Sequence, residues 1–301
     1  MELTVKIGSG TLPNPVGVAS GTFGYGSEYE ELVDLSKLGA IYSKAVTPEP
    51  RPGNDIPRII ETPAGLLNSI GLANVGLERF ITEKLPLFRS FHCPVIVNVA
   101  GKNDEDYCTV VETLDQFSEV WGYEINLSCP NVKEGCLAFG SNPSYVENLT
   151  RKLRKLSSKP MIVKLTPNVT DIASIAKAAE AGGADAVSCI NTLVGMVIDI
   201  HRKKPVLPAS TGGLSGPAIK PVGVAAVYRV KRAVGIPVIG IGGIQNAEDA
   251  IEYLLAGASG VQIGTATFVD PAAPAKVLEG IAAYMEQEGL NTLEDFHQFI
   301  S

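Results

Sequence analysis

The chain has 301 residues, of which 45% are hydrophobic and 19% charged, enough apolar material for one large core. Its formal net charge is −7 and it has no long basic run, so binding to nucleic acid or to an anionic membrane surface is not expected. Five cysteines without a CxxC pair argue against a disulfide scaffold, an iron–sulfur cluster or a structural zinc site. The sequence shows neither a signal peptide nor an apolar stretch long enough to span a membrane, and this predicts a soluble cytoplasmic protein.

Short runs rich in Val and Ile predict eight β-strands, at 16–20, 40–46, 94–100, 122–129, 160–167, 186–192, 237–243 and 260–266. They are nearly continuous apolar runs, as is typical of parallel strands covered on both faces. Helical periodicity occurs over 28–39, 75–90, 104–119, 142–158, 171–182, 219–235, 246–258 and 272–288. Eight strand–helix repeats predict an α/β fold, a (β/α)8 TIM barrel, as a single domain over 1–301. A doubly wound open sheet is the less favoured alternative, because the glycines after the first strand do not spell GxGxxG.

Two connections are too long to be plain linkers. Residues 47–74 follow the second strand and residues 193–218 follow the sixth. Long insertions at the C-terminal ends of barrel strands usually build the active site, so we expect both to contribute to it.

Polar residues end most of the predicted strands. They are Ser20, Lys44, Asn98, Asn126, Cys129, Lys164, Asn191 and Thr192. Burying such side chains costs free energy unless they form hydrogen bonds or ion pairs. A barrel brings the C-terminal ends of its strands together around one opening, its mouth. The pattern therefore predicts a ligand at the mouth.

The turns after the last two strands indicate a phosphate. Gly242 and Gly243 follow the seventh strand, and Gly264 and Thr265 follow the eighth. Glycines allow backbone N–H groups to approach an anion, and this is the common phosphate position in TIM barrels. Two tight turns without a ligand are the alternative. A further glycine cluster at 211–220 lies where it can close over the same phosphate.

The residues at the other strand ends indicate which kind of molecule contains that phosphate. Lys44 and Lys164 fit either the electron-rich edge of a flavin or a Schiff base, as in a phosphosugar aldolase or isomerase, and structural ion pairs are a further reading. Carboxamides offer donor and acceptor together, which suits a flat ring with amide groups; they are Asn68, Asn98, Asn126 and Asn191. Because no Asp or Glu ends a strand, a flavin is favoured over a sugar.

Cys129 is the candidate catalytic residue. A nucleophilic cysteine needs a histidine partner, and among His92, His201 and His297 only His201 lies in an insertion that can reach the mouth. A general base is favoured over a nucleophile and over an inert buried thiol. Gly135 and Gly140 flank the following segment, which suggests a mobile lid.

Four segments together resemble the dihydroorotate dehydrogenase family. They are NLSCPNVKEG, ETPAGLLNSIGLANVG, ASGTFGYG and IGIGGI…IGTA, and they occur in the family's order over essentially the whole chain. The resemblance implies an FMN-binding (β/α)8 barrel that oxidises (S)-dihydroorotate to orotate in pyrimidine biosynthesis. It also implies that Cys129 removes the C5 proton while hydride passes from C6 to the flavin.

The resemblance further implies two sets of binding residues. Substrate would meet Lys44, Asn68, Ser69, Ile70, Gly71, Leu72, Asn126, Asn191 and Thr192. One FMN per chain would meet Ser20, Lys44, Ala45, Asn98, Asn126, Lys164, Ile190, Gly216, Gly242, Gly243, Gly264 and Thr265.

A cysteine base resembles class 1 of the family, and TPEPRPGNDIPRIIETPAG with NVKEGCLAFGSNP resembles its NAD-linked B type. This implies a homodimer core within a heterotetramer, with FAD and a 2Fe–2S cluster on a separate electron-transfer subunit. The fumarate-linked A type is the alternative. Cys136, in the expected lid, has no role that the sequence assigns.

Overall fold

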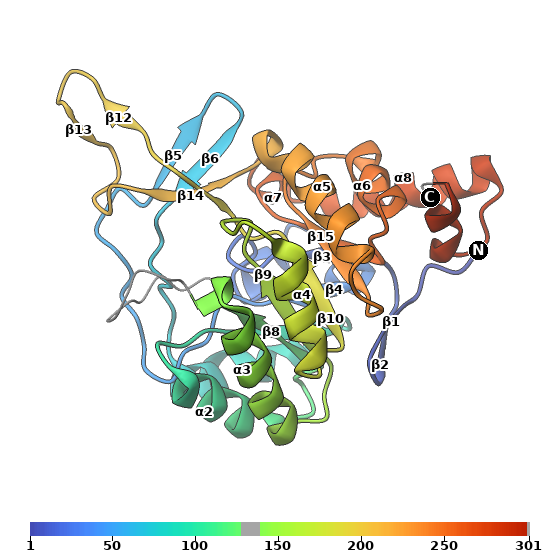
Figure 1. The fold of residues 1–301 in the computed structure, drawn as a ribbon, viewed down its shortest axis with the longest axis horizontal. Coiled ribbons are helices and arrows are strands. Elements are labelled where there is room, and N and C mark those ends of the chain that lie inside the picture. Colours follow the sequence, from blue (N-terminus) through green and yellow to red (C-terminus); the bar gives the residue numbers. More distant parts are fainter. Residues whose placement is uncertain (128–138, 300–301) are drawn as a thin grey trace.

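A computed structural model describes residues 1–127 and 139–299 of the chain (Figure 1). Eight parallel strands close into a barrel, and each lies within one of the predicted segments. In order around the barrel they are β3 (Val16–Val18), β4 (Ala40–Tyr42), β7 (Val95–Val99), β8 (Gly122–Asn126), β9 (Met161–Leu165), β10 (Ala186–Cys189), β15 (Val238–Ile241) and β16 (Gly260–Ile263). The predicted (β/α)8 TIM barrel is confirmed.

The barrel strands are buried on both faces, which explains their apolar sequences. Every residue of β7 and β9 is buried, and so is every residue of β10, β15 and β16. Side chains that alternate between the two faces either fill the barrel or pack under the helices. The few polar residues of these strands are therefore held inside the barrel.

The helices cover the outside of the barrel (Figure 1). The long ones are α2 (Asp104–Asp115), α3 (Pro143–Leu156), α4 (Ile172–Ala181), α5 (Lys220–Lys231), α6 (Ala247–Leu255) and α8 (Ala273–Glu288). Side chains of Asn103, Asn142, Asp171 and Asn246 accept backbone N–H groups at the starts of α2, α3, α4 and α6, the usual N-cap arrangement. The predicted helix over 75–90 is three short helical pieces, α1 (Leu77–Arg79), the π-helix η3 (Phe80–Lys84) and the 3₁₀-helix η4 (Leu85–Ser90). A short helix α7 (Ala266–Val269), which was not predicted, follows β16.

The helix predicted over 28–39 is wrong. Two 3₁₀ turns, η1 (Ser27–Tyr29) and η2 (Leu35–Lys37), occupy this connection. Asp34 is extended and accepts both the backbone N–H and the hydroxyl of Ser36. Such local side-chain hydrogen bonds compete with helix formation, so the helical periodicity of the segment is overridden.

The two long insertions combine into one small sheet. Its strands are β5 (Ile59–Thr62) and β6 (Gly65–Asn68) from the first insertion, and β11 (Leu193–Gly195) and β14 (Gly212–Ser215) from the second. β6 pairs with β14, and β12 (Ile198–Asp199) and β13 (Lys204–Pro205) form a hairpin beyond them. In Figure 1 this sheet projects from one end of the barrel. An added Cβ at Gly65 would lie 2.0 Å from the Ser215 carbonyl oxygen, so only glycine allows the two backbones to meet there.

The opposite end of the barrel carries the hairpin β1 (Val5–Ile7) and β2 (Gly10–Leu12). The termini lie near one another, where Glu2 pairs with Thr292 ahead of the 3₁₀-helix η7 (Leu293–Gln298) (Figure 1). The 3₁₀-helices η5 (Phe139–Ser141) and η6 (Pro217–Ile219) complete the described elements. Over residues 1–127 and 139–299, no helix is both long and apolar enough to cross a membrane.

Candidate active site

A cavity of about 510 Å³ opens at the C-terminal ends of the barrel strands. We call it the mouth cavity. Its wall includes these predicted site residues: Ser20, Lys164, Ile190, Asn191, Thr192, Gly216, Gly242, Gly243, Gly264 and Thr265. They come from β9, from the second insertion and from the turns after β3, β10, β15 and β16, and residues 61–66 of the first insertion also line the wall. Its volume lies in the usual range for small-molecule sites, about 300–1,000 Å³.

Glycines line one end of the mouth cavity. Gly242 and Gly243 have φ of 124° and 71°, which glycine adopts without strain. A Cβ added at Gly243 would lie 2.8 Å from the Lys220 backbone nitrogen, so no side chain fits there. Nearby, the Thr265 hydroxyl donates to Ser215 Oγ at 2.8 Å and joins the last turn to the insertion sheet. This end can approach a ligand closely, as a phosphate site requires.

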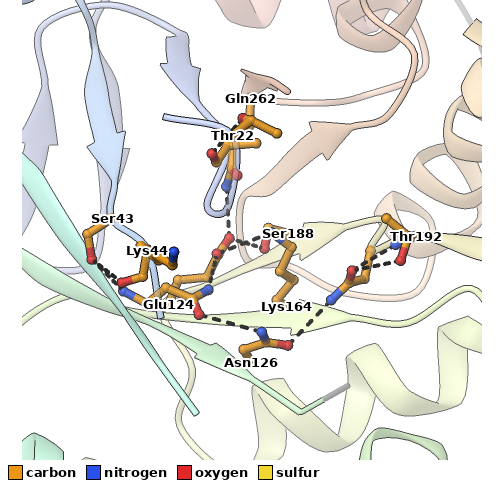
Figure 2. Close-up of polar contacts among 12 residues, drawn as sticks. Thr22, Ser43, Lys44, Glu124, Asn126, Lys164, Ser188, Thr192 and Gln262 are labelled. Carbon is orange, nitrogen blue, oxygen red and sulfur yellow. Dashed lines mark hydrogen bonds and ion pairs between the residues drawn. The ribbon is translucent and has the colours of Figure 1, made fainter. Parts of the chain in front are cut away.

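Three predicted carboxamides are linked in a row. Asn191 Nδ2 donates to Asn126 Oδ1 at 3.4 Å, and Asn126 Nδ2 donates to Asn98 Oδ1 at 3.5 Å (Figure 2). Asn191 Oδ1 in turn accepts the backbone N–H of Thr192 at 2.7 Å. Asn191 lies in the cavity wall, whereas Asn98 is fully buried. The row therefore runs from the ligand-accessible wall into the barrel interior.

Sequence reasoning missed a buried carboxylate, Glu124, two residues before Asn126 in β8. Its Oε2 accepts from Asn98 Nδ2 at 2.7 Å and from Lys164 Nζ at 3.3 Å. Its Oε1 accepts from Ser188 Oγ at 2.8 Å and from Gln262 Nε2 at 2.9 Å (Figure 2). All of these contacts are donors and one of them is a cation, so Glu124, which has no exposed surface, is paired with Lys164 as its counter-ion.

The signal for Glu124 was present in the sequence. Residues two apart in a strand share one face, so a charged residue two before Asn126 lies on the same inward face. Burial, and after it the charge of Glu124, raise the pKa of the Tyr42 hydroxyl inside the barrel. The charge of Glu124 thus affects a group that is not among its hydrogen-bond partners.

Other predicted residues lie outside the cavity wall. Among the described residues, the wall does not include Lys44, Ala45, Asn98, Asn126 or the loop 68–72. Asn126 reaches the wall through its hydrogen bond with Asn191, and Asn68 donates to the Gly213 carbonyl at 3.1 Å within the insertion sheet. Lys44 follows β4 and is partly exposed.

The predicted base Cys129 and Cys136 lie outside the described residues, and so does the expected lid between Gly135 and Gly140 as far as residue 138. The described cysteines are free. Burial raises the pKa of Cys93 to about 12, and it also raises the pKa values of Cys108 and Cys189, so none of these thiols is prone to ionise. His201 is exposed between β12 and β13, and its backbone N–H is held by Asp199.

The family model and the individual relatives that match this chain agree with one another. A family model described as "Dihydroorotate dehydrogenase" matches residues 2–285. A protein of Alkaliphilus metalliredigens is 53% identical over 295 residues, covering 98% of this chain and 97% of its own. One of Alkaliphilus oremlandii is 54% identical over 299 residues (99% and 98%), and one of Geotalea uraniireducens 50% over 294 residues (98% and 96%). All of these relatives are named "Dihydroorotate dehydrogenase B (NAD(+)), catalytic subunit".

Proposed function

This chain belongs to the dihydroorotate dehydrogenase family, and we propose that it oxidises (S)-dihydroorotate to orotate as the catalytic subunit of an NAD+-linked enzyme of pyrimidine (UMP) biosynthesis. The observation that carries the proposal is the mouth cavity, where Lys164 and the glycine turns meet at the ends of the barrel strands. Full-length relatives with about half of their residues identical and one shared name support it.

The family implies a flavin, and we propose one FMN per chain in a single barrel domain over 1–301. The wall fits it: glycines at one end let backbone groups lie close to a phosphate, and Lys164 supplies a buried cation for a ring edge. Ring contacts are assigned to Ser20, Lys44, Ala45, Asn98, Asn126, Lys164 and Ile190. Phosphate-side contacts are assigned to Gly216, Gly242, Gly243, Gly264 and Thr265. Bound FMN supplies an acceptor for hydride.

The chemistry assigned to the chain itself is proton removal and substrate binding. Cys129, as thiolate, takes the C5 proton of dihydroorotate. The pair of electrons left at C5 forms the C5=C6 double bond of orotate as hydride leaves C6. Substrate is held by Lys44, the loop Asn68, Ser69, Ile70, Gly71 and Leu72, and by Asn126, Asn191 and Thr192. The insertion sheet covers one side of this site, since Gly65 and Leu66 of β6 and Ser215 of β14 lie in the cavity wall.

The electrons then leave through a second protein. The relatives' names contain the words "catalytic subunit", which implies a separate partner. We propose that this partner carries FAD and a 2Fe–2S cluster and passes electrons to NAD+, with a homodimer of this chain at the centre of a cytoplasmic heterotetramer. No cluster of metal-ligating side chains occurs in the part of the chain that the structure describes.

Purification from the native source followed by an absorption spectrum tests this assignment. The expected result is a complex with FMN, FAD and iron–sulfur bands that reduces NAD+ with dihydroorotate. A lone FMN protein that reduces fumarate instead would place the chain in the fumarate-linked type. A colourless protein that traps an aldehyde at Lys164 on borohydride treatment would favour an aldolase and refute the proposal.

A further inference from the structure

Lys164 connects the mouth cavity with the interior of the barrel. It lies in the cavity wall, yet it is only 6% exposed, and its ammonium contacts Glu124 Oε2 at 3.3 Å. Glu124 itself is not in the wall and has no exposed surface. The chain therefore places a negative charge directly behind the cation that faces the ligand.

The surroundings of Glu124 are arranged for a negative charge. Asn98, Ser188 and Gln262 come from three different strands, β7, β10 and β16, and each turns a donor toward the carboxylate. Gln262 donates through its Nε2, and its side chain also hydrogen-bonds the Tyr42 hydroxyl inside the barrel. Glu124 and Tyr42 together therefore hold the orientation of this amide.

We propose that Glu124 is a positioning residue for the reaction. It fixes the Lys164 ammonium at the cavity wall and offsets its positive charge, and so holds the reduction potential of the bound flavin below the value that an unpaired lysine would give. This inference rests on the proposed binding of FMN. Its physical basis is that charge is screened weakly inside a protein, and that a reduced flavin gains negative charge which a nearby cation stabilises.

The variant Glu124→Gln removes the negative charge and keeps the shape of the side chain. Gln262 is able to rotate its amide so that its Oε1 accepts from the new Nε2 donor, while Asn98 and Lys164 still donate to the remaining carbonyl oxygen of residue 124. The midpoint potential of bound FMN is measured at pH 7 against redox dyes under anaerobic conditions. We expect the equilibrium constant for flavin reduction to rise at least tenfold, which is about 30 mV for a two-electron couple.

Ser188→Ala is the matched control, because it removes a hydrogen bond to the same carboxylate without changing any charge. We expect less than a threefold change in the same equilibrium constant. An unchanged or lower potential in Glu124→Gln, or an equal shift in both variants, would overturn the proposal, since packing alone would then account for the effect.

If Glu124→Gln does not fold, the double variant Glu124→Gln/Lys164→Met replaces it, since it leaves neither buried charge unpaired. It is compared with Lys164→Met, in which the carboxylate of Glu124 remains. We expect a higher potential in the double variant, because only the single variant keeps the negative charge. Equal potentials in the two would overturn the role of Glu124. A wild-type protein whose absorption spectrum shows no FMN would instead refute the proposed function, before any potential is compared.

Discussion

Lys164 and Glu124 form an ion pair that is almost completely shielded from solvent, with side-chain exposures of 7% and 0%. A pair of this kind is costly to bury, but removing only one partner is worse, because the other charge is left without compensation. The pair therefore affects the stability of the barrel as well as the electrostatics of the mouth cavity.

Lys164→Met is expected to lower the free energy of unfolding of the cofactor-free protein by about 3–5 kcal/mol, the usual cost of stranding a buried charge. The double variant Glu124→Gln/Lys164→Met should recover most of this loss, because no charge remains. Urea unfolding of both variants measures the difference. A single variant as stable as the double one would contradict the role of Lys164 as the counter-ion of Glu124.

Cys129→Ser tests the proposed base. The rate of dihydroorotate oxidation at pH 7 should fall by about 10²–10⁴-fold, the usual contribution of a general base, while FMN stays bound. In the unmodified protein the rate should rise with pH and level off above the thiol pKa of ~8.5, because only the thiolate accepts the proton. Serine ionises at much higher pH, so its rate should still be rising there. Steady-state rates from pH 6 to 10 measure this, and an unchanged profile would exclude Cys129 as the base.

The sequence alone predicted the positions of some residues of the mouth cavity but not of others. The strand-end rule predicted the positions of Lys164, Asn191 and the glycine turns, because residues that end parallel strands must meet at one mouth. It missed Glu124, which lies one inward-facing position deeper, where apolar runs are expected and a lone charge is easily overlooked. The rule does not predict the hydrogen-bond partners of buried polar side chains, because those partners come from strands that are distant in sequence.

At the scale of elements, the insertion sheet is the feature that local patterns did not predict. β6 and β14 belong to insertions more than a hundred residues apart, and their pairing depends on a close backbone approach at Gly65. The sequence predicted that both insertions lie at the mouth but gave no register or partner. The eight barrel strands were easier, because each is an apolar run with a length typical of a buried strand.

Gly65→Ala is expected to weaken FMN binding at least tenfold. Its Cβ would overlap the Ser215 carbonyl and push away Gly216, which lies in the cavity wall. Gly289→Ala is the matched control: it also needs a positive φ, of 70°, but its Cβ meets nothing within 4 Å. Fluorescence titration of cofactor-free protein with FMN compares the two. Equal losses of affinity in both variants would mean that backbone strain, and not the insertion sheet, is responsible.

At the scale of the whole molecule, the two ends of the barrel differ in what they contain. Among the described residues, none of the predicted site residues lies at the end with the β1–β2 hairpin and the paired termini, whereas the strand ends and both insertions surround the mouth cavity. This arrangement follows from parallel strands, whose C-terminal ends all point the same way. The fold could therefore be predicted from the order of its elements, but the partner subunit is indicated only by the family resemblance and by the relatives' names.

The central claim is that dihydroorotate delivers hydride to a flavin held in the mouth cavity. Anaerobic titration of the purified protein with dihydroorotate, followed by absorbance and by orotate formation, tests it most directly. We expect a yellow protein whose flavin absorbance is bleached with one orotate formed per FMN. A yellow protein that dihydroorotate leaves fully oxidised would contradict the claim.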